Sequence, residues 1–224
     1  MQDTARAPRA SRYRHAYLLV VLICVIMLPP FLANLFLGGA LIETLLFFAL
    51  LAGSYAAAAN RRRFWLCLTL AVLALGLRLG WSIEPSSFLL HGFLVSHIAF
   101  FSVVGITLVG HLFEPQREIS ADTLFGALAV YLILGIIWSY AYAMLEATAP
   151  GSFSFGVEHA TTEARFDRFI GFSFTTLTTL GYGNVSPTTA RADALSTMEA
   201  IVGQCYLAIV IARLVSLQIT QAKS

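Results

Sequence analysis

The chain has 224 residues, of which 58% are hydrophobic and only 12% charged, and its formal net charge is +2. A soluble domain carries about 25% charged residues, so this composition excludes an ordinary soluble protein. The small net charge gives no reason to expect a nucleic-acid partner. Apolar stretches of about 20 residues are long enough to cross a bilayer, so the sequence predicts an all-α integral membrane protein in contact with lipid.

Six apolar segments are predicted to be transmembrane helices, at 16–36, 39–58, 64–81, 88–112, 124–145 and 192–216. Pro29 and Pro30 are expected to kink the first near its end, because proline lacks the amide hydrogen that a helix interior uses. No clear small-residue cleavage site follows this segment, so we expect it to be retained rather than removed as a signal peptide. Cys24, Cys67 and Cys205 lie inside apolar stretches and are expected to be small core residues.

Basic residues gather on one side of the membrane if the N-terminus is cytoplasmic. The six crossings then return the C-terminus to the cytoplasm. Ten of the fourteen basic residues fall on that side, namely Arg6, Arg9, Arg12, Arg14, Arg61, Arg62, Arg63, Arg117, Arg213 and Lys223. This positive-inside bias predicts a multi-pass protein of the inner cell membrane with both termini in the cytoplasm.

A shorter apolar stretch, 169–180, lies between the fifth and sixth spans and is followed at once by Gly181-Tyr182-Gly183. It is too short to cross the bilayer and is expected to be a re-entrant half-helix. Its non-helical continuation is tolerated at membrane depth only where it is buried in protein or lines an aqueous pathway. The predicted layout is therefore span, outer loop, half-helix, irregular loop and span.

The residues of the irregular loop suit the binding of a dehydrated cation. Rings of backbone carbonyls can replace the water around such an ion. Successive carbonyls face one side when backbone angles alternate between ordinary and left-handed, and Gly181 and Gly183 accept positive φ without a Cβ clash. The side chains of Leu180 and Tyr182 would then point outward and pack, while Thr179 adds a hydroxyl at the inner end. The half-helix would direct its partially negative C-terminus at the ion path.

The segment Thr179-Leu180-Gly181-Tyr182-Gly183 resembles the TVGYG signature of potassium channels, with Leu at the second position. The resemblance extends over about 122–216, with 172–179 similar to the pore helix and Pro187 to the proline that commonly follows the filter. It implies a tetrameric potassium-channel pore architecture and a homotetramer, since one chain carries one filter strand. It also implies that K⁺ is the transported ion and that no other metal or cofactor is needed.

Within this segment the resemblance implies that the carbonyls of Thr179, Leu180, Gly181 and Tyr182, with the Thr179 hydroxyl, bind K⁺. Thr175, Thr178 and Asn184 would support the filter. Many potassium channels have an aspartate directly after the filter, where this chain has Asn184, and some have a glutamate at the position of Thr175. Because both are neutral here, we expect altered filter stability and inactivation rather than lost selectivity.

The last span carries three candidate residues for gating or for the cavity. The resemblance places Gly203 at the inner-helix glycine that is often regarded as a gating hinge, and it implies that Gln204 faces the cavity. Glu199 lies one turn before Gly203 on the same helix face. It is expected either to accept hydrogen bonds from the pore helix or to contribute charge near the cavity.

The four leading spans lack the arginine series of a voltage sensor, because 88–112 contains no arginine. We therefore divide the chain into a cytoplasmic tail (1–15), a four-helix accessory domain (16–113) and a pore domain (114–224), with no soluble regulatory domain expected. Arg78 is a basic residue well inside the third predicted span, 64–81. Glu43, at a comparable depth in the second span, is its predicted intramembrane partner, and a gating role for this pair is the alternative.

Three functions compete on the sequence alone. The favoured one is a potassium-selective channel that conducts passively and catalyses no reaction. A weakly selective cation channel of the same fold is the nearest rival, since Leu180 and Asn184 depart from the commonest pattern. A membrane sensor or enzyme would use Glu43, His91 and His97 in the first four spans, although these residues show no metal-site or nucleophile–base spacing.

Overall fold

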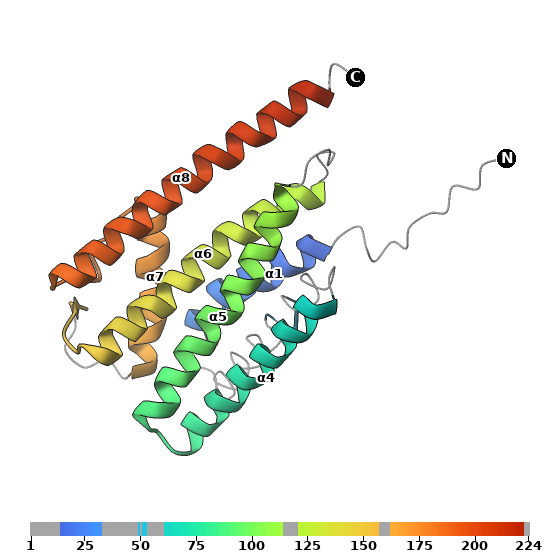
Figure 1. Ribbon diagram of the computed structural model, residues 1–224. Helices are drawn as coiled ribbons and strands as arrows, with labels where there is room; N and C mark the ends of the chain where they lie inside the picture. Colours follow the sequence, from blue (N-terminus) through green and yellow to red (C-terminus); the bar gives the residue numbers. More distant parts are fainter. Residues whose placement is uncertain are drawn as a thin grey trace.

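A computed structural model describes residues 14–32, 49, 51–52, 61–113, 121–156 and 162–221 (Figure 1). Within these ranges the fold is all-α. The helices are α1 (Arg14–Met27), α2 (Pro29–Leu32), α4 (Arg61–Ile83), α5 (Ser87–Leu112), α6 (Ala121–Thr148), α7 (Thr162–Leu177) and α8 (Ala190–Gln221). The short strands β1 (Phe153–Ser154) and β2 (Ser186–Pro187) form one antiparallel pair.

Four of these helices, α4, α5, α6 and α8, are long and apolar enough to cross a membrane. They correspond to the third, fourth, fifth and sixth predicted spans. The first predicted span appears as the shorter apolar helix α1, followed by α2. The second predicted span, 39–58, lies outside the described residues except for positions 49, 51 and 52. The chain is thus a multi-pass membrane protein, and the crossing number of six stays a prediction.

The two prolines interrupt the first apolar segment as predicted. Helix α1 ends at Met27, and the four-residue helix α2 begins at Pro29. The amide of Leu28 still donates to the carbonyl of Cys24, at 3.0 Å, so the regular pattern holds up to the residue before the prolines. Without their amide hydrogens, Pro29 and Pro30 cannot continue it.

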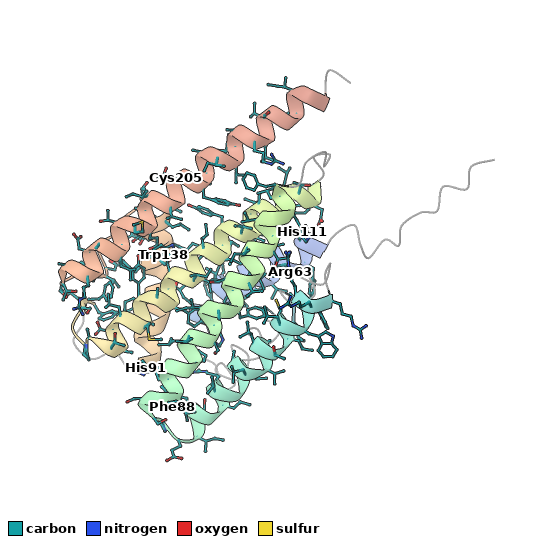
Figure 2. The ribbon with its side chains drawn as sticks, in the orientation of Figure 1. Arg63, Phe88, His91, His111, Trp138 and Cys205 are labelled. Carbon is teal, nitrogen blue, oxygen red and sulfur yellow. The ribbon has the colours of Figure 1, made fainter. Side chains whose placement is uncertain are left out.

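Helices α4 and α5 form an antiparallel pair joined by a tight connection. Ser86 caps the start of α5, because its hydroxyl accepts a hydrogen bond from the amide of Leu89 at 3.3 Å. Figure 2 shows Arg63 and His111 at one end of this pair and Phe88 and His91 at the other. The paired helices therefore place the start of α4 beside the end of α5.

Helix α6 is central in the bundle and contacts α1, α5, α7 and α8 (Figure 1). Its Tyr140 is buried and packs against three rings of α5, those of Phe93, His97 and Phe101. The ring centroids of His97 and Tyr140 are 4.8 Å apart. One hydrophobic core thus extends from the proposed accessory segment into the proposed pore segment.

Two polar contacts join helices at the end of the bundle where α1 and α6 begin and α5 and α8 end. The Nδ1 atom of His15 on α1 lies 2.8 Å from Oδ2 of Asp122 on α6. The Nε atom of Arg213 on α8 donates to the carbonyl of Leu112 on α5, at 3.0 Å. Exposed arginines 61–63 begin α4 at this same end. Of the basic residues that the charge pattern groups together, arginines 61–63 and Arg213 therefore share one end of the bundle.

Candidate functional site

Helix α7 lies between α6 and α8 and carries the candidate site at its C-terminal end (Figure 1). It begins at Thr162, earlier than the expected start at 169, and ends at Leu177 rather than 180. The ring of Phe174 sits on Gly135 of α6 so closely that a Cβ there would be 2.7 Å from ring atoms. The small residue on α6 thus sets the approach of α7.

The end of α7 is a Schellman motif that leads directly into the candidate filter. The amide of Leu180 donates to the carbonyl of Thr175 at 2.7 Å, and that of Thr179 donates to Thr176 at 2.9 Å. The amide of Gly181 also donates to Thr175, at 3.1 Å. This motif places a left-handed residue at its C′ position, which is Thr179 with φ of +59°. The first filter residues are therefore bonded to the last turn of α7.

Left-handed backbone angles alternate along the candidate filter. Thr179, Gly181 and Gly183 have φ values of +59°, +59° and +75°, whereas Leu180 and Tyr182 do not have positive φ. The positive angles at the two glycines agree with the sequence prediction. The positive φ at Thr179 was not expected from the sequence, because β-branched residues rarely adopt it. Such an alternation is the backbone geometry that carbonyls on one side of a strand require.

A short antiparallel pair of strands, β1 and β2, holds the segment that follows the filter. Strand β1 pairs with β2, with Phe153 opposite Pro187. The carboxylate of Glu146 accepts hydrogen bonds from the amides of Gly151, at 3.0 Å, and Phe153, at 3.2 Å. The fifth span was predicted to end at 145, whereas α6 continues to Thr148 and buries Glu146. The carboxylate thereby fixes the turn that precedes β1.

The three predicted filter-support residues lie around the filter. The hydroxyl of Thr175 donates to the carbonyl of Phe172 at 3.0 Å, and that of Thr178 to Phe174 at 2.6 Å. Both hydroxyls therefore bond to α7 itself. Asn184 is exposed in the bend before β2, and a Cβ on Gly156 would be 3.8 Å from its carbonyl oxygen. Their support of the filter stays a prediction.

Gly203 lies on the face of α8 that touches the end of α7. A Cβ on Gly203 would be 2.7 Å from the carbonyl oxygen of Leu177 and 2.8 Å from Leu177 Cδ1. Helix α8 is continuous through this residue. The glycine therefore permits a close helix approach, which is a role that the sequence did not suggest. The hinge assignment stays a prediction.

Glu199 and Gln204 differ sharply in surroundings. Glu199 is 0% exposed, and its Oε1 lies within hydrogen-bond distance of Oγ of Ser173 on α7, at 2.5 Å. Its Oε2 accepts from the hydroxyl of Tyr142 on α6. Glu199 therefore contacts α7, as the first of its two predicted roles requires, and its function at the site stays a prediction. Gln204 is exposed on the single chain, and its cavity position stays a prediction.

Of the predicted pair of Arg78 and Glu43, the structure describes Arg78. Arg78 is partly buried, with its guanidinium 5.2 Å from the ring centroid of Trp81 and 5.6 Å from that of Phe93. These contacts are cation–π distances. Glu43 lies outside the described residues. His91 and His97 each bond within α5, with Nδ1 near the carbonyls of Ser87 and Phe93, and no cluster of three or more possible metal ligands occurs among the described residues.

Three residues of the site were missed from the sequence: Tyr131, Tyr142 and Ser173. Tyr131 donates to the carbonyl of Leu177 at 3.2 Å, and the other two bond to Glu199. A polar group at helical spacing within a span is the signal that could have identified them. Such a signal does not reveal which polar groups meet, since the partners are 26 to 57 residues apart.

Comparison with known proteins agrees with this geometry. Residues 126–219 match the family described as ion channel. The match begins within α6, contains α7 and the candidate filter, and ends near the end of α8. No curated protein matches the chain. Residues 126–219 are an ion channel domain, and such a domain is not an enzyme.

Proposed function

We propose that this chain, whose residues 126–219 form an ion channel domain, is a subunit of a potassium-selective channel. The alternating backbone of Thr179, Gly181 and Gly183 is the observation that carries the proposal. In this role the carbonyls of 179–182 and the Thr179 hydroxyl replace the hydration shell of K⁺. The ion moves passively along its electrochemical gradient.

The exposure of the filter side chains supports assembly into a homotetramer. Leu180 is 57% exposed and Tyr182 is 70% exposed in the single chain. Large apolar side chains that hold a filter need packing partners, so these partners come from other copies.

The shared end of the bundle supports the proposed orientation. The starts of α1, α4 and α6 and the ends of α5 and α8 lie together there, with arginines 61–63 of α4 and Arg213 of α8. The positive-inside rule assigns that end to the cytoplasm. The filter end then faces the outside of an inner cell membrane.

A flux assay with a matched glycine pair tests the filter assignment. A Cβ added at Gly181 or at Gly171 would have no neighbouring atom within 4 Å, but only Gly181 has positive φ. Alanine at Gly181 therefore adds a backbone penalty of about 1–2 kcal/mol per chain without a clash. In liposomes, Gly181→Ala should lose K⁺ flux, whereas Gly171→Ala should conduct. Equal flux from both variants would contradict the assignment.

Selectivity is tested separately by reversal potentials in mixed K⁺ and Na⁺. For a potassium-selective pore, the reversal potential should stay at the K⁺ equilibrium potential when the Na⁺ gradient is inverted. A reversal potential midway between the K⁺ and Na⁺ equilibrium potentials would instead support the weakly selective cation channel.

A further inference from the structure

The carboxyl group of Glu199 joins three helices at a fully buried point. Glu199 comes from α8, Ser173 from α7 and Tyr142 from α6, and all three are 0% exposed. The Oε1 atom lies 2.5 Å from Ser173 Oγ, and Oε2 contacts the Tyr142 hydroxyl. Two hydroxyl groups therefore face the two carboxyl oxygens.

The hydroxyl of Ser173 has a second close neighbour. Its Oγ lies 2.7 Å from the carbonyl oxygen of Gly135 on α6, and the hydroxyl of Ser139 donates to the same carbonyl. A carbonyl oxygen can only accept, and a serine hydroxyl has one hydrogen. Both contacts of Ser173 are within hydrogen-bond distance, and the one with Glu199 is shorter than usual, so each needs its own hydrogen.

Counting hydrogens separates the two forms of Glu199. If the carboxyl is ionised, Ser173 has one hydrogen for two acceptors, and one contact places oxygen lone pairs against each other. If Oε1 carries a proton, Glu199 donates to Ser173, Ser173 donates to Gly135, and Tyr142 donates to Oε2. Only the protonated form supplies every contact with a hydrogen. It also avoids a buried charge, which is costly at membrane depth.

We propose that Glu199 is a neutral carboxylic acid whose proton completes a hydrogen-bonded chain from α8 through Ser173 to Gly135. This series of hydrogen bonds positions α7 between α6 and α8. Ser173 lies two residues before Thr175, whose carbonyl accepts the amides of Leu180 and Gly181. Glu199 is thus a positioning residue for the candidate filter, and this role rests on the proposed function.

A second buried acid of the same subunit supplies a matched control. Glu146 is 9% exposed and accepts from two backbone amides, those of Gly151 and Phe153. Backbone amides donate and cannot accept, so neither of these two contacts requires a proton on Glu146. The two glutamates differ in the groups that face them, and this difference makes Glu146 the matched control for Glu199.

Infrared spectroscopy of the full-length protein in lipid bilayers at neutral pH tests the protonation state. The wild type and Glu146→Gln should show the C=O stretching band of a protonated carboxyl, and Glu199→Gln should lack it. Ser173→Ala should shift the band, because it removes the acceptor of the acid's hydrogen. The proposal would be overturned if the wild type lacked the band or if Glu199→Gln kept it. A band at the same position in Ser173→Ala as in the wild type would also overturn it.

Ion flux tests the positioning role. Glutamine keeps a donor and an acceptor in the shape of the neutral acid, so Glu199→Gln should conduct like the wild type. Glu199→Leu offers neither and should conduct less. Loss of flux in Glu199→Gln to the level of Glu199→Leu would overturn the positioning role. The infrared result does not depend on which ion permeates, so its failure is distinguishable from failure of potassium selectivity.

Discussion

Thr179 adopts a backbone angle that β-branched residues rarely adopt, and it does so where glycine is the usual helix-ending residue. A left-handed angle costs a non-glycine residue about 1–2 kcal/mol. Glycine at this position would avoid the cost but would also remove the hydroxyl at the inner end of the candidate filter. The strained threonine therefore fits a residue whose side chain is used, as strain at functional sites often indicates.

At the same scale, Gly203→Ala should destabilise the protein. Alanine favours a helix over glycine by about 1 kcal/mol, but overpacking against Leu177 costs about 1–3 kcal/mol, so the net loss is up to about 2 kcal/mol. Unfolding in mixed micelles measures this difference. Gly76→Ala on α4 is the control and should stabilise, since no atom lies within 4 Å of its Cβ position. Stabilisation by both substitutions would contradict the close-approach role of Gly203.

The sequence predicts residues whose role is set by their own backbone better than residues whose role is set by a partner. Gly181 and Gly183 were identified because only glycine accepts positive φ freely. The Glu199 cluster was only partly identified, because its members come from three helices and no spacing rule connects them. The proximity of Gly203 to Leu177 is a packing fact of the same kind.

Among the elements, α8 has two different attachments within the subunit. Its first half bonds to α7 and α6 through Glu199, and its second half bonds to α6 and α5. Tyr206 donates to the carbonyl of Ala127 at 2.6 Å, and Arg213 donates to Leu112 at 3.0 Å while lying 4.9 Å from the ring centroid of Phe113. The leading helices therefore contact the last helix near its C-terminal end.

Arg213→Gln should weaken this attachment. A hydrogen bond from a charged donor contributes about 1.5–3 kcal/mol when partly buried, so we expect a loss of roughly 1–2 kcal/mol in unfolding free energy. Unfolding in mixed micelles provides the measurement. Arg191→Gln, at the exposed start of α8, is the control for the lost charge. If the two variants lose the same stability, the Leu112 contact contributes nothing beyond charge.

The element boundaries show where sequence patterns lose precision. The predicted span 64–81 lies within α4, and the predicted span 88–112 nearly coincides with α5. Both agree well because an apolar run bounded by polar residues defines a helix well. The fifth span was predicted to end at 145, since Glu146 is charged. The helix continues because amides of the following turn satisfy that carboxylate. Such local partners are not visible in an apolar pattern.

At the scale of the whole molecule, the single chain leaves its filter side chains and much of α8 uncovered. We expect native mass spectrometry in K⁺-containing detergent to show a species of four 24.4 kDa chains. Four copies would surround one axis and give each carbonyl ring one oxygen per chain, as a ring of filter strands requires. A mass that corresponds to one or two chains would contradict the tetramer.

The contact of Gly203 with Leu177 also limits how α8 can turn about its own axis. Rotation in either direction would bring the side chain of a neighbouring residue toward the place where the glycine leaves room for the Leu177 carbonyl. Bending of α8 on the C-terminal side of residue 203 does not require this. The close contact between Gly203 and Leu177 thus restrains rotation of the N-terminal part of α8 about its own axis. Any large swing of α8 is expected to be confined to 204–221, the part that Tyr206 and Arg213 attach to its neighbours.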